Sequence, residues 1–206
     1  MRKLLLEHDD FIQGSFELGK LNLLFVFQVN CPGCFLYGIP VINGIFLENK
    51  DKGLNVLGLS TAFEDFEFNT AEFTKRLLEE KTMVGETAKA FKQQGLKTYP
   101  NPIDFPVAFD KMVDPSEFIT ERNVEHICNF NPNFKSRDES DQKRMRKLVK
   151  EHFMQMPKIA VTFTMNQLRG TPSCILFDKN FHIKEQWFGH ENFNEINKII
   201  EKWMSG

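Results

Sequence analysis

Apolar residues gather in short runs that are separated by polar and turn-forming residues, and these runs predict the strands of a buried sheet. The runs cover residues 21–29, 54–59, 104–110 and 175–177. Continuous apolar runs of this length, rich in β-branched and aromatic residues, are typical of strands that are covered on both faces. Residues 181–188 alternate in part after a polar turn, so they predict the second strand of a hairpin.

Between these runs, apolar residues recur at the three- and four-residue spacing of a helix. The clearest case is residues 35–50, which are apolar at positions 35, 36, 39, 42, 45 and 46. Further helices are predicted at residues 70–80 and 86–94. A C-terminal helix, capped by Asn192, would carry one apolar face made of Phe193, Ile196, Ile199, Ile200 and Trp203. This succession of strands and helices predicts an α/β protein.

Composition excludes several classes of protein. The 206 residues carry a net charge of −2, and 41% are hydrophobic, as expected of a folded chain. The near-neutral balance gives no reason to expect binding to nucleic acid, and no apolar run approaches the roughly 18 residues that span a membrane. The apolar residues 4–6 are too short for a secretory signal. If Met1 is the natural start, we expect a cytoplasmic protein.

Two of the four cysteines, Cys31 and Cys34, form a Cys-Pro-Gly-Cys motif, whereas Cys128 and Cys174 stand alone. A lone Cys-x-x-Cys serves either as half of a zinc site or as a thiol–disulfide redox pair. Zinc would need a second pair of ligands at matching spacing, and the sequence has none. The motif lies between a predicted buried strand and a predicted helix, which favours the redox pair.

A helix N-terminus carries unpaired N–H groups and a partial positive charge. A sulfur placed there is stabilised as thiolate, so its pKa falls below the usual value of about 8.5. We therefore expect Cys31 to be the exposed attacking thiolate and Cys34, one turn later, to be the buried resolving thiol. Pro32 suits the first helical position, and Gly33 lets another backbone approach closely.

A second motif, Arg-Gly-Thr-Pro-Ser-Cys at residues 169–174, directly precedes a predicted strand. A proline in such a tight turn is a candidate for a cis peptide bond. The order of these elements resembles the thioredoxin fold: strand, Cys-Pro-Gly-Cys, helix with Pro40, strand, helix, strand, Gly-Thr-Pro, hairpin and terminal helix. Residues 29–40 and 58–65 are similar to the redoxin or TlpA-like thiol–disulfide oxidoreductase family. The resemblance covers about residues 20–110 and 158–204.

The resemblance implies a mixed central sheet flanked by helices and an enzyme that exchanges thiols with disulfides. Cys31 would be its nucleophile and Cys34 its resolving thiol. Pro172 would be the cis-proline that faces the sulfurs, and the backbone at Thr171 would pair with a substrate strand, with Pro32 and Gly33 also in the substrate-binding set. No cofactor or metal is implied. The expected partners are a protein or small-molecule disulfide and a thiol or reductase that donates electrons, with reduction as the favoured direction.

The chain also departs from the family pattern. The family usually has Trp before the first cysteine, where this chain has Asn30. A buried carboxylate often assists the second thiol, and here Glu17, Asp104 and Asp110 are candidates by position only.

A thioredoxin fold does not require residues 111–157, so we expect a single domain, residues 1–206, with a helical insertion there. Helices are predicted at residues 117–128 and from about 139 to 156, with a loop at 129–138. The second helix has a basic face made of Lys143, Arg144, Arg146, Lys147 and Lys150. Such a face is typical of a solvated surface, although docking of an acidic partner or nucleic acid is the alternative. We also hypothesise that the insertion shapes substrate access.

Other functions stay open on the sequence. A peroxiredoxin-like thiol peroxidase would need Pro-x-x-x-Thr-x-x-Cys before its thiol, and residues 24–30 contain neither Pro nor Thr. A metal or Fe–S binding module would use Cys31 with another thiol. A redox-inactive scaffold is a further alternative. Cys174 is expected to be a buried inert thiol, with a third redox thiol as the alternative, and Cys128 is similarly ambiguous.

Overall fold

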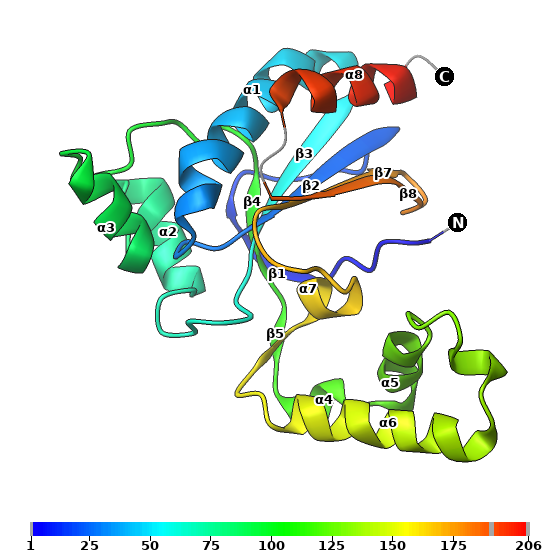
Figure 1. Ribbon diagram of the computed structural model, residues 1–206. Helices are drawn as coiled ribbons and strands as arrows, with labels where there is room; N and C mark the ends of the chain where they lie inside the picture. Colours follow the sequence, from blue (N-terminus) through cyan, green and yellow to red (C-terminus); the bar gives the residue numbers. More distant parts are fainter. Residues whose placement is uncertain (1, 190–191, 205–206) are drawn as a thin grey trace.

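The computed structural model describes residues 2–189 and 192–204, and the sheet is their central feature. Within these residues the sheet has six strands in the order β1–β4–β3–β2–β7–β8. They are β1 (His8–Gln13), β2 (Leu21–Phe27), β3 (Leu54–Ser60), β4 (Val107–Asp110), β7 (Ser173–Asp178) and β8 (Ile183–Phe188). β2, β3 and β4 are parallel, whereas β1, β7 and β8 run antiparallel to their neighbours. The predicted mixed sheet flanked by helices is confirmed (Figure 1).

Helices pack on both sides of this sheet. They are α1 (Ile39–Asn49), α2 (Ala71–Glu80), α3 (Gly85–Gln93), α7 (Val161–Met165) and α8 (Phe193–Met204). Short helical turns lie at η1 (Cys34–Gly38) and η2 (Lys50–Lys52). α1 and α8 lie together over one face of the sheet, and α7 lies on the other side (Figure 1). The helices predicted at residues 70–80 and 86–94 are confirmed as α2 and α3.

β2 is buried along its whole length because the sheet is covered on both faces. Phe25 and Phe27 belong to the core that includes residues of α1 and α8. Leu24 and Val26 belong to the opposite core, which includes Phe163 of α7. This double burial explains why the sequence of β2 is a continuous apolar run rather than an alternating one. The side chain of Phe193, predicted on the apolar face of α8, lies outside the described part.

Two features of the sheet differ from the sequence prediction. The strand predicted at residues 104–110 begins only at Val107, because Pro106 has no N–H to donate to a ladder. β1 was not predicted. It is an edge strand that pairs with β4 through two register shifts, and its sequence His-Asp-Asp-Phe-Ile-Gln is largely polar because its outer edge faces solvent.

Residues 111–157 contain the predicted helices, arranged differently from the prediction. A two-stranded ladder of β5 (Met112–Val113) and β6 (Ile159–Ala160) forms the base, followed by α4 (Pro115–Phe118), α5 (Glu121–Cys128), η3 (Phe134–Ser136) and α6 (Glu139–Met154). The helix predicted at residues 117–128 is confirmed only from Glu121 on, as α5, because residues 117 and 118 belong to the separate helix α4. The Thr120 hydroxyl accepts a hydrogen bond from the N–H of Asn123, which starts a new helix there. These helices lie apart from the sheet, below it in Figure 1.

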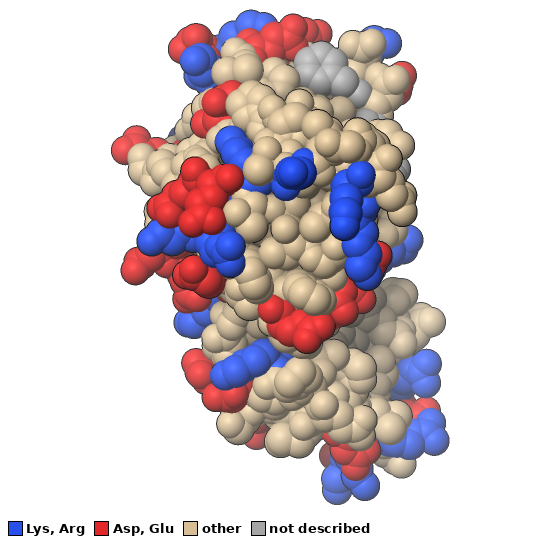
Figure 2. Space-filling model, turned by 90° about the vertical axis from the view of Figure 1, so that its left-hand side faces the viewer, with Lys and Arg blue, Asp and Glu red and all other residues tan. Residues whose placement is uncertain are grey.

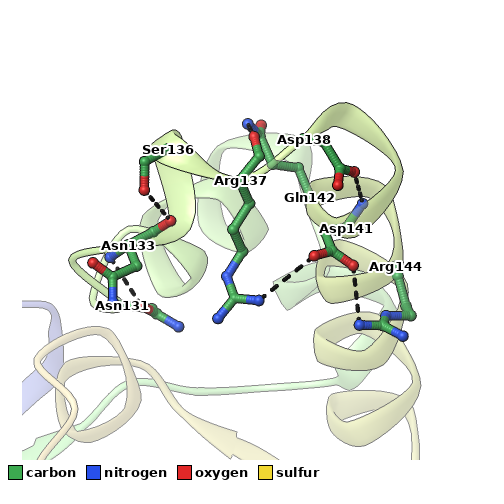
Figure 3. Close-up of polar contacts among 8 residues, drawn as sticks. All are labelled: Asn131, Asn133, Ser136, Arg137, Asp138, Asp141, Gln142 and Arg144. Carbon is green, nitrogen blue, oxygen red and sulfur yellow. Dashed lines mark hydrogen bonds and ion pairs between the residues drawn. The ribbon is translucent and has the colours of Figure 1, made fainter.

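Polar contacts hold the far end of this helical segment. Asp138 caps α6 by accepting a hydrogen bond from the N–H of Asp141 at 2.8 Å. The carboxylate of Asp141 in turn pairs with Arg137 and Arg144, so one residue joins the loop to the helix (Figure 3). No helix in the described residues is long and apolar enough to cross a membrane.

Candidate functional site

The Cys-Pro-Gly-Cys motif follows the central strand β2, at the point where the chain turns into its first helical segment. Helical backbone begins at Pro32, which suits that position because a first-turn residue needs no N–H. Pro32 and Gly33 are half-buried. This end of α1 lies on the left in Figure 1, the side that faces the viewer in Figure 2. Figure 2 shows a broad area there without Lys, Arg, Asp or Glu, bordered by charges of both signs.

The two sulfurs lie in different surroundings. Cys31 is half-buried, whereas Cys34 has no exposed surface. Hydrogen bonds to the Cys31 sulfur, first from the Cys34 thiol and then from the Thr171 side chain and backbone N–H groups, lower the pKa of Cys31 to about 6 despite its partial burial. One of those N–H groups belongs to Cys34 and lies 3.3 Å from the Cys31 sulfur. Burial, followed by the interaction with Cys31, raises the pKa of Cys34 well above its ordinary value.

The Thr171–Pro172 peptide bond is cis and faces these sulfurs. The carbonyl oxygen of Thr171 lies 3.6 Å from the Cys31 sulfur and accepts a hydrogen bond from it when Cys31 is a protonated thiol. Pro172 packs against the first helix: a Cβ added to Gly38 would lie 3.3 Å from the Cβ of Pro172 and 3.0 Å from the Phe25 ring. The structure therefore brings together all six residues that the sequence proposed for the site, although the two motifs are about 140 positions apart.

The helix after Cys34 is widened, and a tyrosine supports it. The N–H of Ile39 donates to the carbonyl of Cys34, five residues earlier, so η1 is a π-helical turn. In this register the carbonyl of Phe35 would need the N–H of residue 40, which is a proline and has none. The hydroxyl of Tyr99 fills that position and donates to the Phe35 carbonyl at 3.1 Å. Tyr99 is buried, and its ring meets that of Phe35 edge to face.

Solved structures resemble this arrangement over the whole chain. A thiol–disulfide isomerase from Corynebacterium glutamicum is 21% identical, with a TM-score of 0.60, over 100% of this chain and 97% of its own. A thioredoxin-like superfamily protein is 20% identical, with a TM-score of 0.59, over 100% and 96% of the two chains. The chain has the thioredoxin-like fold. No protein-family model matches it, and no curated protein matches it in sequence.

In this thioredoxin-like chain, Asn30 replaces the usual tryptophan and ties the redox motif to two other segments. Its side-chain amide donates to Asp65 at 2.8 Å, and its side-chain oxygen accepts from the N–H of Glu86, at the start of α3, at 2.6 Å. Its own N–H donates to the side chain of Asn69 at 3.0 Å. Gly85 leaves room for this contact, because an added Cβ there would lie 2.1 Å from the Asn30 oxygen.

We expect Asn30→Ala to loosen the start of α3. The substitution leaves the N–H of Glu86 without its acceptor, and a net hydrogen bond of about 1–1.5 kcal/mol corresponds to roughly tenfold faster amide exchange there. Hydrogen exchange read at the Glu86 amide measures the effect. Asp65→Asn is the matched control, since it keeps an acceptor for Asn30 and should leave the exchange near the wild-type rate. Equal exchange in Asn30→Ala and wild type would contradict the role.

The buried side chain of Gln28 forms a hydrogen bond with the cis-proline loop. Its side-chain oxygen accepts the Thr171 hydroxyl at 3.1 Å, and its amide reaches the carbonyl of Glu64 at 3.4 Å. Gln28 is 2% exposed. Neither Gln28 nor Tyr99 was predicted from the sequence as a site residue. A polar residue at the end of an apolar strand, such as Gln28, is a signal that points to a buried polar contact.

Of the three carboxylates considered for assisting Cys34, those of Asp104 and Asp110 are hydrogen-bonded elsewhere, and Glu17 is exposed. Asp110 is fully buried and accepts hydrogen bonds from Thr61 and from the N–H groups of Thr162 and Phe163, so it anchors the start of α7. Burial raises the pKa of Asp110 to about 6, against these hydrogen bonds. Asp104 and Asn43 are joined by two hydrogen bonds. The backbone carbonyl of Glu17, not its carboxylate, accepts a hydrogen bond from the Asn55 side chain.

The two remaining cysteines are buried in different core clusters, Cys174 in the one that also contains Cys34 and Cys128 in another. Cys128 is fully buried beside Val124 and Phe134. Cys174 is 8% exposed and lies in β7 opposite Phe25. Among the described residues, no three His, Cys, Asp or Glu side chains are placed to hold a metal ion together.

Proposed function

We propose that this chain is a thiol–disulfide oxidoreductase of the redoxin or TlpA-like kind, which reduces protein disulfides with Cys31 and Cys34. The observation that carries the proposal is the asymmetry of the two neighbouring sulfurs. One is accessible and has a pKa of about 6, so it is largely thiolate at neutral pH. The other is inaccessible and held as a thiol. Thiol–disulfide exchange needs an attacking thiolate and a second thiol within reach of the product.

The reaction then follows in two exchanges. The Cys31 thiolate attacks one sulfur of the substrate disulfide, forms a mixed disulfide and expels the other substrate sulfur as thiolate. Cys34 then loses its proton and attacks the Cys31 sulfur, which releases the second substrate thiolate and leaves a Cys31–Cys34 disulfide. Two electrons have passed from the pair to the substrate. A thiol or reductase returns them, and this completes the cycle.

The environment of Cys34 favours this order of events. Part of the rise in its pKa comes from the negative charge and hydrogen bond of Cys31. Once Cys31 is joined to the substrate its charge is gone, so that part of the rise disappears and Cys34 deprotonates more readily. Thr171 and Pro172 lie beside the attacking sulfur, where the Thr171 backbone would pair with the substrate strand. Pro32 and Gly33 would line the other side of it.

The test is reversible oxidation of the pair coupled to reduction of a protein disulfide. Purified protein is expected to reduce insulin with dithiothreitol as electron donor. After reaction with insulin alone, peptide mapping should find Cys31 and Cys34 joined and two hydrogen atoms lighter. Cys128 and Cys174 serve as internal controls and should stay reduced. Insulin turnover no faster than with dithiothreitol alone, with no Cys31–Cys34 disulfide, would overturn the proposal.

A further inference from the structure

A wide cleft lies between the inserted helices and the sheet. Its volume is about 1150 Å³, above the roughly 300–1,000 Å³ of ordinary small-molecule pockets. Leu148 of α6 and Phe188 of β8 both line it and are 58% and 51% exposed. Large apolar side chains exposed toward a common cleft are typical of a surface that binds another molecule.

The charged side chains that line this cleft are all of one sign. Arg2, Lys158 and Arg169 line it, and no Asp or Glu does so among the described residues. Lys158 is neutralised by Asp114 at 2.8 Å. Arg2 and Arg169 form no ion pair within the described part of the chain; Arg2 donates to the backbone carbonyl of Asn166 and lies over the Phe130 ring. The cleft therefore combines apolar walls with two uncompensated cations, and a ligand that complements it carries both apolar groups and carboxylates.

The cleft is continuous with the cis-proline loop. Arg169 and Ser173, on either side of Thr171 and Pro172 in the sequence, both line it. Gly170 lies directly on the apolar wall, because an added Cβ there would be 2.9 Å from the Phe188 ring. A polypeptide whose disulfide reaches Cys31 along the Thr171 backbone therefore meets the cleft within a few residues. Its open shape and large volume suit an extended polypeptide segment.

We infer that this cleft binds the segment next to the substrate disulfide, and that it selects acidic segments with apolar side chains. The inference rests on the proposed function, which brings the disulfide to Cys31. Leu148 and Phe188 cover the apolar side chains of the segment, and Arg169 pairs with its carboxylates. The insertion thus contributes one wall of the substrate site.

Two disulfide peptides of equal apolar content test this, one with three acidic residues beside the cystine and one with three lysines. The wild-type protein should reduce the acidic peptide with a KM about tenfold lower. Arg169→Glu should abolish or reverse that preference. Leu148→Glu, on another wall, should also raise the KM for the acidic peptide. Lys143→Glu is the matched control, because Lys143 is exposed on α6 but does not line the cleft, and it should keep the preference.

Binding is measured separately from chemistry, with fluorescent peptides in which serine replaces each cysteine. Wild-type protein should bind the acidic peptide about tenfold more tightly than the basic one, and Arg169→Glu should remove the difference. Equal binding of the two peptides, or a preference that survives Arg169→Glu, would overturn the cleft inference. Reduction of bis(2-hydroxyethyl) disulfide, which is small and neutral, reports the redox pair alone. If the protein does not reduce this small disulfide but still binds the acidic peptide selectively, the proposed function is overturned and the cleft inference stands.

Discussion

Turnover of a protein disulfide is expected to fall by about 10³-fold or more when Cys31 is replaced by serine. The accessible sulfur is the attacking group, and a serine hydroxyl at the same place is neither ionised at neutral pH nor able to form a disulfide. The backbone N–H of Cys34 stays where it is, so the loss is chemical rather than structural. Insulin reduction measures it, and thermal unfolding checks that the variant is folded.

Cys174→Ala is the matched control for Cys31→Ser. It removes a sulfur from the core, where Cys174 is 8% exposed, but leaves the Cys-Pro-Gly-Cys motif intact, so turnover per folded molecule should be unchanged.

The wild-type protein adds a pH test. Because the pKa of Cys31 is lowered to about 6, its alkylation by iodoacetamide should speed up as the pH rises through 6 and then level off. A midpoint near 8.5–9, or an active Cys31→Ser, would show that Cys31 is not an activated thiolate.

The sequence predicted the central part of the fold because local pattern and tertiary position agree there. β2 is a continuous apolar run because both of its faces are covered. In the helix after it, apolar residues recur at helical spacing. Cys31 and Cys34 lie at that junction by chain order alone. The position of the Thr171–Pro172 turn could not be predicted from local pattern. It followed only from the order of all the strands and helices, which places the turn opposite the motif.

The supporting residues could not be predicted because their roles depend on segments distant in sequence. Tyr99 acts on a carbonyl that the π-helical turn and Pro40 leave without a donor, and nothing near Tyr99 in the sequence shows this. Asn30 looked like the loss of an aromatic residue, whereas its side chain joins the motif to Asp65 and Glu86. The positive charge of the cleft depends on Arg2 and Arg169, which line it from distant parts of the chain.

The second large effect is expected from Cys34→Ser, which should trap the enzyme on its substrate. Cys31 still attacks, but no thiol remains to release the product, so the mixed disulfide accumulates. Incubation with oxidised insulin should give a covalent complex on a non-reducing gel in high yield, and dithiothreitol should reverse it. Multiple turnover should fall by about 10²-fold or more because release then depends on external thiol.

Comparison of Cys34→Ser with Cys34→Ala separates the two roles of Cys34. The hydrogen bond from the Cys34 side chain is the largest influence that lowers the pKa of Cys31. A serine hydroxyl still donates to the Cys31 sulfur, whereas alanine cannot, so the alkylation midpoint of Cys31 should be higher in Cys34→Ala than in Cys34→Ser. Both variants should trap substrate, since neither can resolve. A Cys34→Ser protein that turns over insulin at the wild-type rate without forming a complex would contradict resolution by Cys34, and identical midpoints in the two variants would contradict its control of Cys31.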